Sequence, residues 1–228
     1  LAYYSPASKT LPSYFNFSSI ECSAFNAIPS ISAMIGSPLI NILVNKYGRK
    51  IPTIIAQVGV LIGWILLIIT GKSYSWLAFI SRVVSGISIG GASGIIPTYI
   101  GELAPFEYRG AYGVMNQLSV SIGAVLAYFF GIFVEWRIIA ALSLIPTVIF
   151  FIFIYWVPES PVLNDFINFK KREGEGEDEN KEKLFVRENT KQIIICILAV
   201  VFQQLSGINA LLTNLNNIFT ASKIMLSP

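Results

Sequence analysis

Four amide side chains stand within otherwise apolar stretches of this sequence: Gln117, Gln203, Gln204 and Asn209. An uncharged amide both donates and accepts hydrogen bonds, so a cavity lined by amides suits a neutral ligand rich in hydroxyl groups. Gly207 lies between Gln203 and Asn209, where a bend in a helix would bring both amides toward one cavity. These four amides are therefore the candidate ligand-binding residues. The alternative is that amides only bridge neighbouring helices, and for Asn214, Asn216 and Asn217 it is at least as well supported.

The residue types argue against an enzyme. The chain has no histidine, which excludes a Ser-His-Asp triad and any histidine metal ligand. Gly91-Ala92-Ser93-Gly94 has the pattern of an intramembrane serine protease, but such a serine needs a histidine base. Cys22 and Cys196 lie far apart and form no metal or redox pattern. We therefore expect no catalytic residue, no metal and no cofactor, and the net charge of +3 is too small to suggest a nucleic-acid partner.

The composition instead predicts a membrane protein that surrounds these amides with apolar helices. Of the 228 residues, 54% are hydrophobic and 13% are charged, whereas a soluble domain carries roughly 25% charge. About 20 apolar residues cross a hydrocarbon core, and runs of about that length recur along the chain. We therefore expect an all-α membrane protein with six transmembrane helices, at 24–44, 51–70, 76–100, 111–134, 138–157 and 192–212, the last extending as far as 219.

The charges predict how these spans are oriented. The stretch 165–191 holds seven basic and eight acidic residues and reads as a solvated loop. Basic residues gather on the side of that loop, which should therefore be cytoplasmic, with both termini outside. The predicted organisation is an extracellular segment (1–23), five helices (24–157), a charged cytoplasmic loop (158–191), a sixth helix (192–220) and an extracellular tail (221–228).

Several single residues carry further expectations. Gly86, Gly90 and Gly94 recur every four residues, as do Ser119, Gly123, Ala127 and Gly131, and Gly59 and Gly63 share this spacing. Small residues at this spacing favour close helix packing. Arg82 opens the third span, and we expect it to reach the outer interface. Asn16-Phe17-Ser18 is a glycosylation sequon on the predicted outer side, although most sequons arise by chance.

A set of motifs in order then points to a family. The sequence resembles the sugar porters of the major facilitator superfamily, the glucose-transporter-like proteins, and the resemblance covers nearly the whole chain. The matching motifs are Asn45-Lys46-Tyr47-Gly48-Arg49-Lys50, Arg82 with Gly86, Gly90 and Gly94, Pro97 to Pro105, Arg109-Gly110, Gln117-Leu118, Trp136-Arg137, Pro158-Glu159-Ser160-Pro161 and Gln203 to Ala210.

This resemblance implies a partial chain covering helices two to seven of a twelve-helix transporter. It implies that Gln117, Gln203, Gln204 and Asn209 hydrogen-bond the hydroxyls of a small neutral sugar, a hexose or a disaccharide such as trehalose. It also implies that Arg49, Glu102, Arg109 and Glu159 form a cytoplasmic charge network that favours the outward-open state. Alternating access in a plasma membrane would be the mechanism.

Departures from the family pattern keep a second hypothesis open. Val162 stands where the family usually has arginine, and Thr213 and Asn214 stand where it often has paired tyrosines. The alternative is a non-transporting membrane protein, either a sugar sensor or a truncated product that associates with full-length transporters. Its partners would then include the missing half or a full-length relative, in addition to the lipid bilayer.

Overall fold

The structure, a computed structural model, describes residues 10–160, together with Tyr3, Ala7 and six positions near the C-terminus (Ile194, Ile195, Leu198, Val201, Phe202 and Leu205). The chain divides into two units, 1–164 and 165–228, and the architecture below is that of the first. Residues 10–160 form helices and turns and contain no strand. The expected all-α class is therefore confirmed.

Five of the helical segments are long and apolar enough to cross a membrane, and they correspond to the first five predicted spans. The sixth predicted span lies outside the described residues except for the six positions named above. In chain order the elements are α2 (Leu11–Phe15), α3 (Ser19–Tyr47), α4 (Lys50–Ile69), η1 (Lys72–Tyr74), α5 (Ser75–Leu103), η2 (Phe106–Tyr108), α6 (Arg109–Phe133), α7 (Trp136–Leu142) and α8 (Leu144–Phe153).

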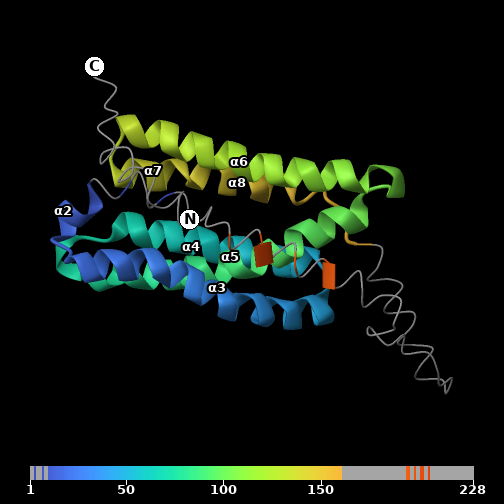
Figure 1. Ribbon diagram of the computed structural model, residues 1–228, viewed down its shortest axis with the longest axis horizontal. Coiled ribbons are helices and arrows are strands. Elements are labelled where there is room, and N and C mark those ends of the chain that lie inside the picture. The colour runs from blue at the N-terminus through green and yellow to red at the C-terminus, as the bar shows by residue number, and fades with distance from the viewer. Residues whose placement is uncertain are drawn as a thin grey trace. The chain divides into compact units, whose positions relative to one another are not determined.

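Short connections make successive long helices antiparallel, so the unit has two distinct ends. We call the end where α3, α5 and α8 finish and α4 and α6 begin the charged end. The opposite end, where α3, α5 and α7 begin, is the aromatic end. Helix α5 packs against both α3 and α4, and α6 contacts α5 and α7. Figure 1 shows α6 along α7 and α8, away from α3.

Glycines allow α3 and α5 to approach at backbone distance. A Cβ added to Gly90 would lie 2.2 Å from the carbonyl oxygen of Ala33, and one added to Gly36 would lie 2.0 Å from that of Ile87. Gly86 is likewise tight, since its Cβ would lie 2.6 Å from the Pro29 carbonyl oxygen. Lipid gives helices no hydrophobic reason to pair, so this close fit is what holds them.

The other small-residue stripes divide into one that packs and one that does not. Added Cβ atoms at Gly59 and Gly63 would meet Ser88 and Ser85 of α5, so these glycines seat α4 against α5. Around Gly123 of α6, in contrast, no described atom lies within 4 Å of the added Cβ. The expectation that the α6 stripe packs closely is therefore wrong at Gly123 for the part of the chain that the structure describes.

The fifth span is interrupted at Ser143, which separates α7 from α8 but keeps helical dihedrals (φ −68°, ψ −15°), so Trp136–Phe153 is still one apolar segment long enough to cross a membrane. Pro146 has no N–H to donate to the carbonyl of Leu142, and its ring crowds that carbonyl. The prolines at 29, 38 and 97, in contrast, lie within continuous helices.

Arg82 does not reach the interface, and that expectation is wrong. Seven residues of α5 precede it, so it lies about 10 Å inside the helix end. Its guanidinium carbon lies 4.6 Å from the ring centre of Tyr3, 4.5 Å from that of Phe25 and 5.8 Å from that of Trp64. The side chain is buried, and Nε and Nη2 have no partner among the described atoms.

Hydrogen bonds from Tyr3 and Arg137 connect the helices at the aromatic end. The Tyr3 hydroxyl donates to the carbonyl of Trp136 at 3.0 Å. Arg137 Nη2 donates to the carbonyl of Thr70, at the end of α4, and to the hydroxyl of Tyr14 in α2. Burial raises the pKa of Tyr3 well above its usual range, so Tyr3 stays a protonated donor.

Candidate functional site

At the charged end, Arg49 and Glu102 form a two-pronged ion pair between α4 and α5. Arg49 Nη2 donates to Glu102 Oε1 at 2.8 Å, and Nε lies 3.1 Å from Oε2. The two side chains are 26% and 14% exposed, so water screens the pair only in part. A planar guanidinium matches a carboxylate in this geometry, which a lysine could not reproduce.

Glu159 belongs to the same site and caps a helix from far along the chain. Helix α4 has no side-chain cap of its own. Instead, Glu159 Oε1 accepts from the backbone N–H groups of Arg49 and Lys50 at 2.9 and 3.1 Å. Those N–H groups carry the positive end of the helix dipole, so a carboxylate is the favoured partner.

Lys50 and Tyr99 fasten the segment on either side of Glu159. Lys50 Nζ donates to the carbonyl of Val157 at 2.7 Å, near the end of α8. The hydroxyl of Tyr99 donates to the carbonyl of Pro158. The segment after α8 is thus bound to the start of α4 and to the last turns of α5.

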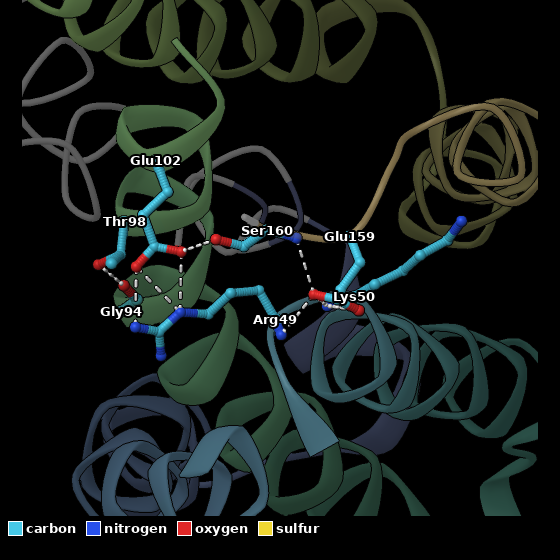
Figure 2. Close-up of polar contacts among 7 residues, drawn as sticks. All are labelled: Arg49, Lys50, Gly94, Thr98, Glu102, Glu159 and Ser160. Atoms are coloured by element: carbon cyan, nitrogen blue, oxygen red, sulfur yellow. Dashed lines mark hydrogen bonds and ion pairs between the residues drawn. The ribbon is translucent and has the colours of Figure 1, made fainter. Parts of the chain in front are cut away.

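Ser160 touches both carboxylates. Its hydroxyl donates to Glu102 Oε2 at 2.5 Å, and its backbone N–H donates to Glu159 Oε1 at 3.1 Å. Figure 2 shows Ser160 between the two glutamates, with the Arg49 side chain extended toward Glu102. The sequence motifs contain Lys50, Tyr99 and Ser160 but assign them no role, because the partners named here lie 58 to 107 positions away. Only the position of Ser160 beside Glu159 was a usable signal.

Of the four residues of the predicted charge network, the structure brings three together. Arg109 starts α6 and is exposed, with its guanidinium carbon 5.4 Å from the ring centre of Phe106. Within the described residues, no hydrogen bond or ion pair joins Arg109 to the other three. Its part in the network stays a prediction.

The predicted sugar-binding amides are not assembled within the described residues. Gln117 lies exposed on α6, a helix with no buried residue, and its backbone carbonyl accepts from the hydroxyl of Ser121. Gln203, Gln204 and Asn209 lie outside the described residues. Their common binding role therefore stays a prediction.

The sequon lies at the aromatic end. Asn16 is exposed and ends α2 in the left-handed conformation, with φ 56°. Ser18 is the N-cap of α3: its hydroxyl accepts from the Glu21 N–H, and its own N–H donates to the Glu21 carboxylate. The acceptor asparagine is accessible, while the sequon serine is engaged by the helix start.

Comparison with known proteins identifies the class. The description "Sugar (and other) transporter" matches residues 2–164, and the chain belongs to this family. This family agrees with the observed bundle of apolar helices that carries an ion pair at one end. A transporter family gives no reason to expect an enzymatic reaction. Among the described residues, no group of three or more His, Cys, Asp or Glu could hold a metal ion.

Individual relatives show how similar the chain is to known sugar transporters and how much of their length it covers. Sugar transporter ERD6-like 6 of Arabidopsis thaliana is 31% identical over 253 residues, which cover 99% of this chain and 52% of that protein. The mouse solute carrier family 2, facilitated glucose transporter member 8, is 30% identical, over 98% of this chain and 51% of that protein. A crystal structure of D-xylose-proton symporter has the same fold, with a TM-score of 0.71 at 24% identity, covering 96% of this chain and 58% of that one. The chain thus spans about half the length of the relatives it matches.

Proposed function

We propose that this chain is the part of a sugar porter that comprises helices two to seven, and that the whole protein moves a neutral sugar by alternating access. The observation that carries the proposal is the polar network of Arg49, Glu102, Ser160 and Glu159, which joins α4, α5 and the segment after α8 at one end of an apolar bundle. A transporter that opens alternately to two sides needs contacts at one end that can be made and released.

The two ends differ in how easily they would separate. At the charged end the Arg49–Glu102 pair is partly exposed, so water replaces its hydrogen bonds at little cost when the end opens. At the aromatic end, rings cover Arg82, and Tyr3 bonds to the backbone of Trp136. We propose that the charged end faces the cytoplasm and holds the outward-open state together.

The substrate we propose is a hexose or a disaccharide such as trehalose. Gln117, Gln203, Gln204 and Asn209 would hydrogen-bond its hydroxyls, because amides suit polyhydroxylated neutral ligands. The names of the relatives, a sugar transporter and a glucose transporter, support a sugar as cargo.

The test compares this chain with the full-length protein that contains it. Each is purified, reconstituted in liposomes and assayed for uptake of labelled glucose, xylose and trehalose. We expect uptake by the full-length protein and none by the 228 residues alone, since the second half of the sugar path is absent. In the full-length protein, Gln117→Ala should raise KM, while Ser119→Ala, two positions away on the same helix, should not.

Two outcomes would contradict the proposal. Uptake by the 228 residues alone would refute their being part of a larger path. Sugar binding by the full-length protein without any uptake would favour the sensor hypothesis. An immunoblot of native membranes, with an antibody to residues 170–183, separates a truncated product of 25.1 kDa from a protein of about twice that mass, the size that twelve spans require.

We also propose that the plasma membrane is the location and that Asn16 is a glycosylation acceptor on its outer side. Its exposure supports this. Peptide-N-glycosidase should lower the apparent mass of the native protein and leave that of Asn16→Gln unchanged. Equal mobility of the native protein with and without the enzyme would contradict the proposal.

A further inference from the structure

Four groups at the charged end form a closed ring of hydrogen bonds. The Arg49 side chain donates to Glu102, and the Arg49 backbone N–H donates to Glu159. Ser160 donates to Glu102 through its hydroxyl and to Glu159 through its N–H. Starting from any member and following the bonds leads back to the same residue, as Figure 2 shows.

We propose that Ser160 is a positioning residue that couples the two carboxylates, so that the charged end opens and closes as one unit. This inference rests on the proposed transport function, which requires that end to be released. Ser160 does not touch substrate in this account. It acts through Glu102 and Glu159, whose partners are the Arg49 side chain and the first N–H groups of α4.

The geometry supports the coupling at each link. Ser160 is 1% exposed, so no water competes for its hydroxyl in the closed ring. A hydroxyl-to-carboxylate bond of 2.5 Å is in the range of strong, charge-assisted bonds. By filling one site on Glu102 Oε2, the hydroxyl fixes the carboxylate where both guanidinium nitrogens of Arg49 reach it.

Without the hydroxyl, the ring is cut at one link, and Arg49 alone joins the two carboxylates, through its side chain to Glu102 and its backbone N–H to Glu159. Arg49 and Glu102 would still form an ion pair, and Glu159 would still cap α4. Loss of one contact would then affect the other only through Arg49, because no second residue would link the two carboxylates. With Ser160 present, loss of either carboxylate breaks the same ring. Contacts within one hydrogen-bond network are non-additive for this reason, whereas independent contacts add.

A double-mutant cycle in the full-length protein tests this coupling. Ala104 follows α5 at the charged end and is 6% exposed, so a cysteine placed there reacts with a maleimide only when that end opens. In an Ala104→Cys background with Cys22 and Cys196 changed to serine, labelling rates are measured for Glu102→Gln, Glu159→Gln and the double variant. The cycle is then repeated with Ser160→Ala and with Ser160→Thr, which keeps the hydroxyl.

With Ser160 present, we expect the double variant to speed labelling by at least about twofold less than the product of the two single effects. With Ser160→Ala the shortfall should shrink, because only Arg49 still joins the two contacts, and with Ser160→Thr it should return. Multiplying effects with Ser160 present, or a shortfall of the same size in Ser160→Ala, would overturn the proposal. If Ser160→Ala does not elute as a single species, Ser160→Gly replaces it.

This measurement needs no sugar, so it fails or succeeds independently of the proposed function. If no sugar is transported by the full-length protein, the proposed function fails while the cycle still shows whether Ser160 couples the ring. If uptake occurs but the cycle shows no coupling, only the inference about Ser160 fails. If Ser160 had a purely structural role, Ser160→Ala would lower the stability of each variant that carries it without changing the size of the shortfall.

Discussion

The glycine contacts between α3 and α5 predict that a glycine-to-alanine substitution destabilises the protein at Gly90. The same substitution at Gly123 of α6, where no described atom is close, should not. Gly90→Ala would place a methyl group 2.2 Å from the carbonyl oxygen of Ala33, whereas ordinary contact begins at 3.4 Å. The two helices would therefore have to part by about 1.2 Å. The obstructing atoms are backbone, so no side chain can turn away to make room.

The expected size follows from two opposing terms. Overpacking costs about 1–3 kcal/mol, and replacing glycine by alanine within a helix returns about 1 kcal/mol. We expect a net loss of up to about 2 kcal/mol for Gly90→Ala. For a chain of this length that lowers the melting midpoint by up to roughly 8 °C. Gly36→Ala should behave similarly, because Ile87 is equally close.

Gly123→Ala in α6 is the matched control. No described atom lies within 4 Å of the added methyl group, so only the helix-propensity gain remains, and the midpoint should stay equal or rise. The assay is thermal unfolding of the purified protein in detergent, followed by tryptophan fluorescence. A fall of equal size in Gly90→Ala and Gly123→Ala would refute the argument from close backbone contact.

Three further substitutions test the two ends of the unit. Burial raises the pKa of Tyr3 above its ordinary value of 10, so the contribution of Tyr3 to stability is full below pH 10 and declines above that pH. The melting midpoint of the native protein should therefore fall more steeply above pH 10 than that of Tyr3→Phe. Parallel curves of midpoint against pH would contradict this. Tyr99→Phe removes the bond to the Pro158 carbonyl, worth about 1 kcal/mol, and should speed labelling of a cysteine at position 104 about fivefold; an unchanged rate would show that this bond does not restrain the segment. Arg82→Lys loses the flat face that stacks on three rings and should cost about 1–2 kcal/mol in thermal unfolding, whereas Arg109→Lys at an exposed position should cost far less.

Hydropathy predicted the five described spans because a membrane requires long apolar helices and allows few alternatives. The first span was predicted to start at Ala24, but α3 begins at Ser19. The first turn of α3 contains polar residues, so the hydropathy pattern did not include it. Ser18 and Glu21 nevertheless have the spacing of a capping box, which marks the start of a helix. The break at Ser143 had a signal in Pro146, but prolines elsewhere lie within continuous helices, so proline alone does not predict a break.

The site was less predictable than the spans. The motifs indicated that Arg49, Glu102 and Glu159 act at one end, and the structure brings them together. That Glu159 caps a helix, and that Ser160 joins it to Glu102, depends on packing between segments more than 50 positions apart. The position of Arg82 was predicted wrongly for a similar reason. The three rings around its guanidinium come from distant parts of the chain, so the residues next to Arg82 do not show whether it is buried or reaches the interface.

The cap on α4 has a consequence for the order in which the protein is built. Its first backbone N–H groups donate to the carboxylate of Glu159, which lies 110 positions after Arg49 in the chain. During synthesis, α4 therefore enters the membrane long before its cap exists, and water or lipid headgroups must satisfy those groups in the meantime. The charged end is completed only when the ribosome has passed residue 160. Chains interrupted earlier would leave the first N–H groups of α4 without their carboxylate partner.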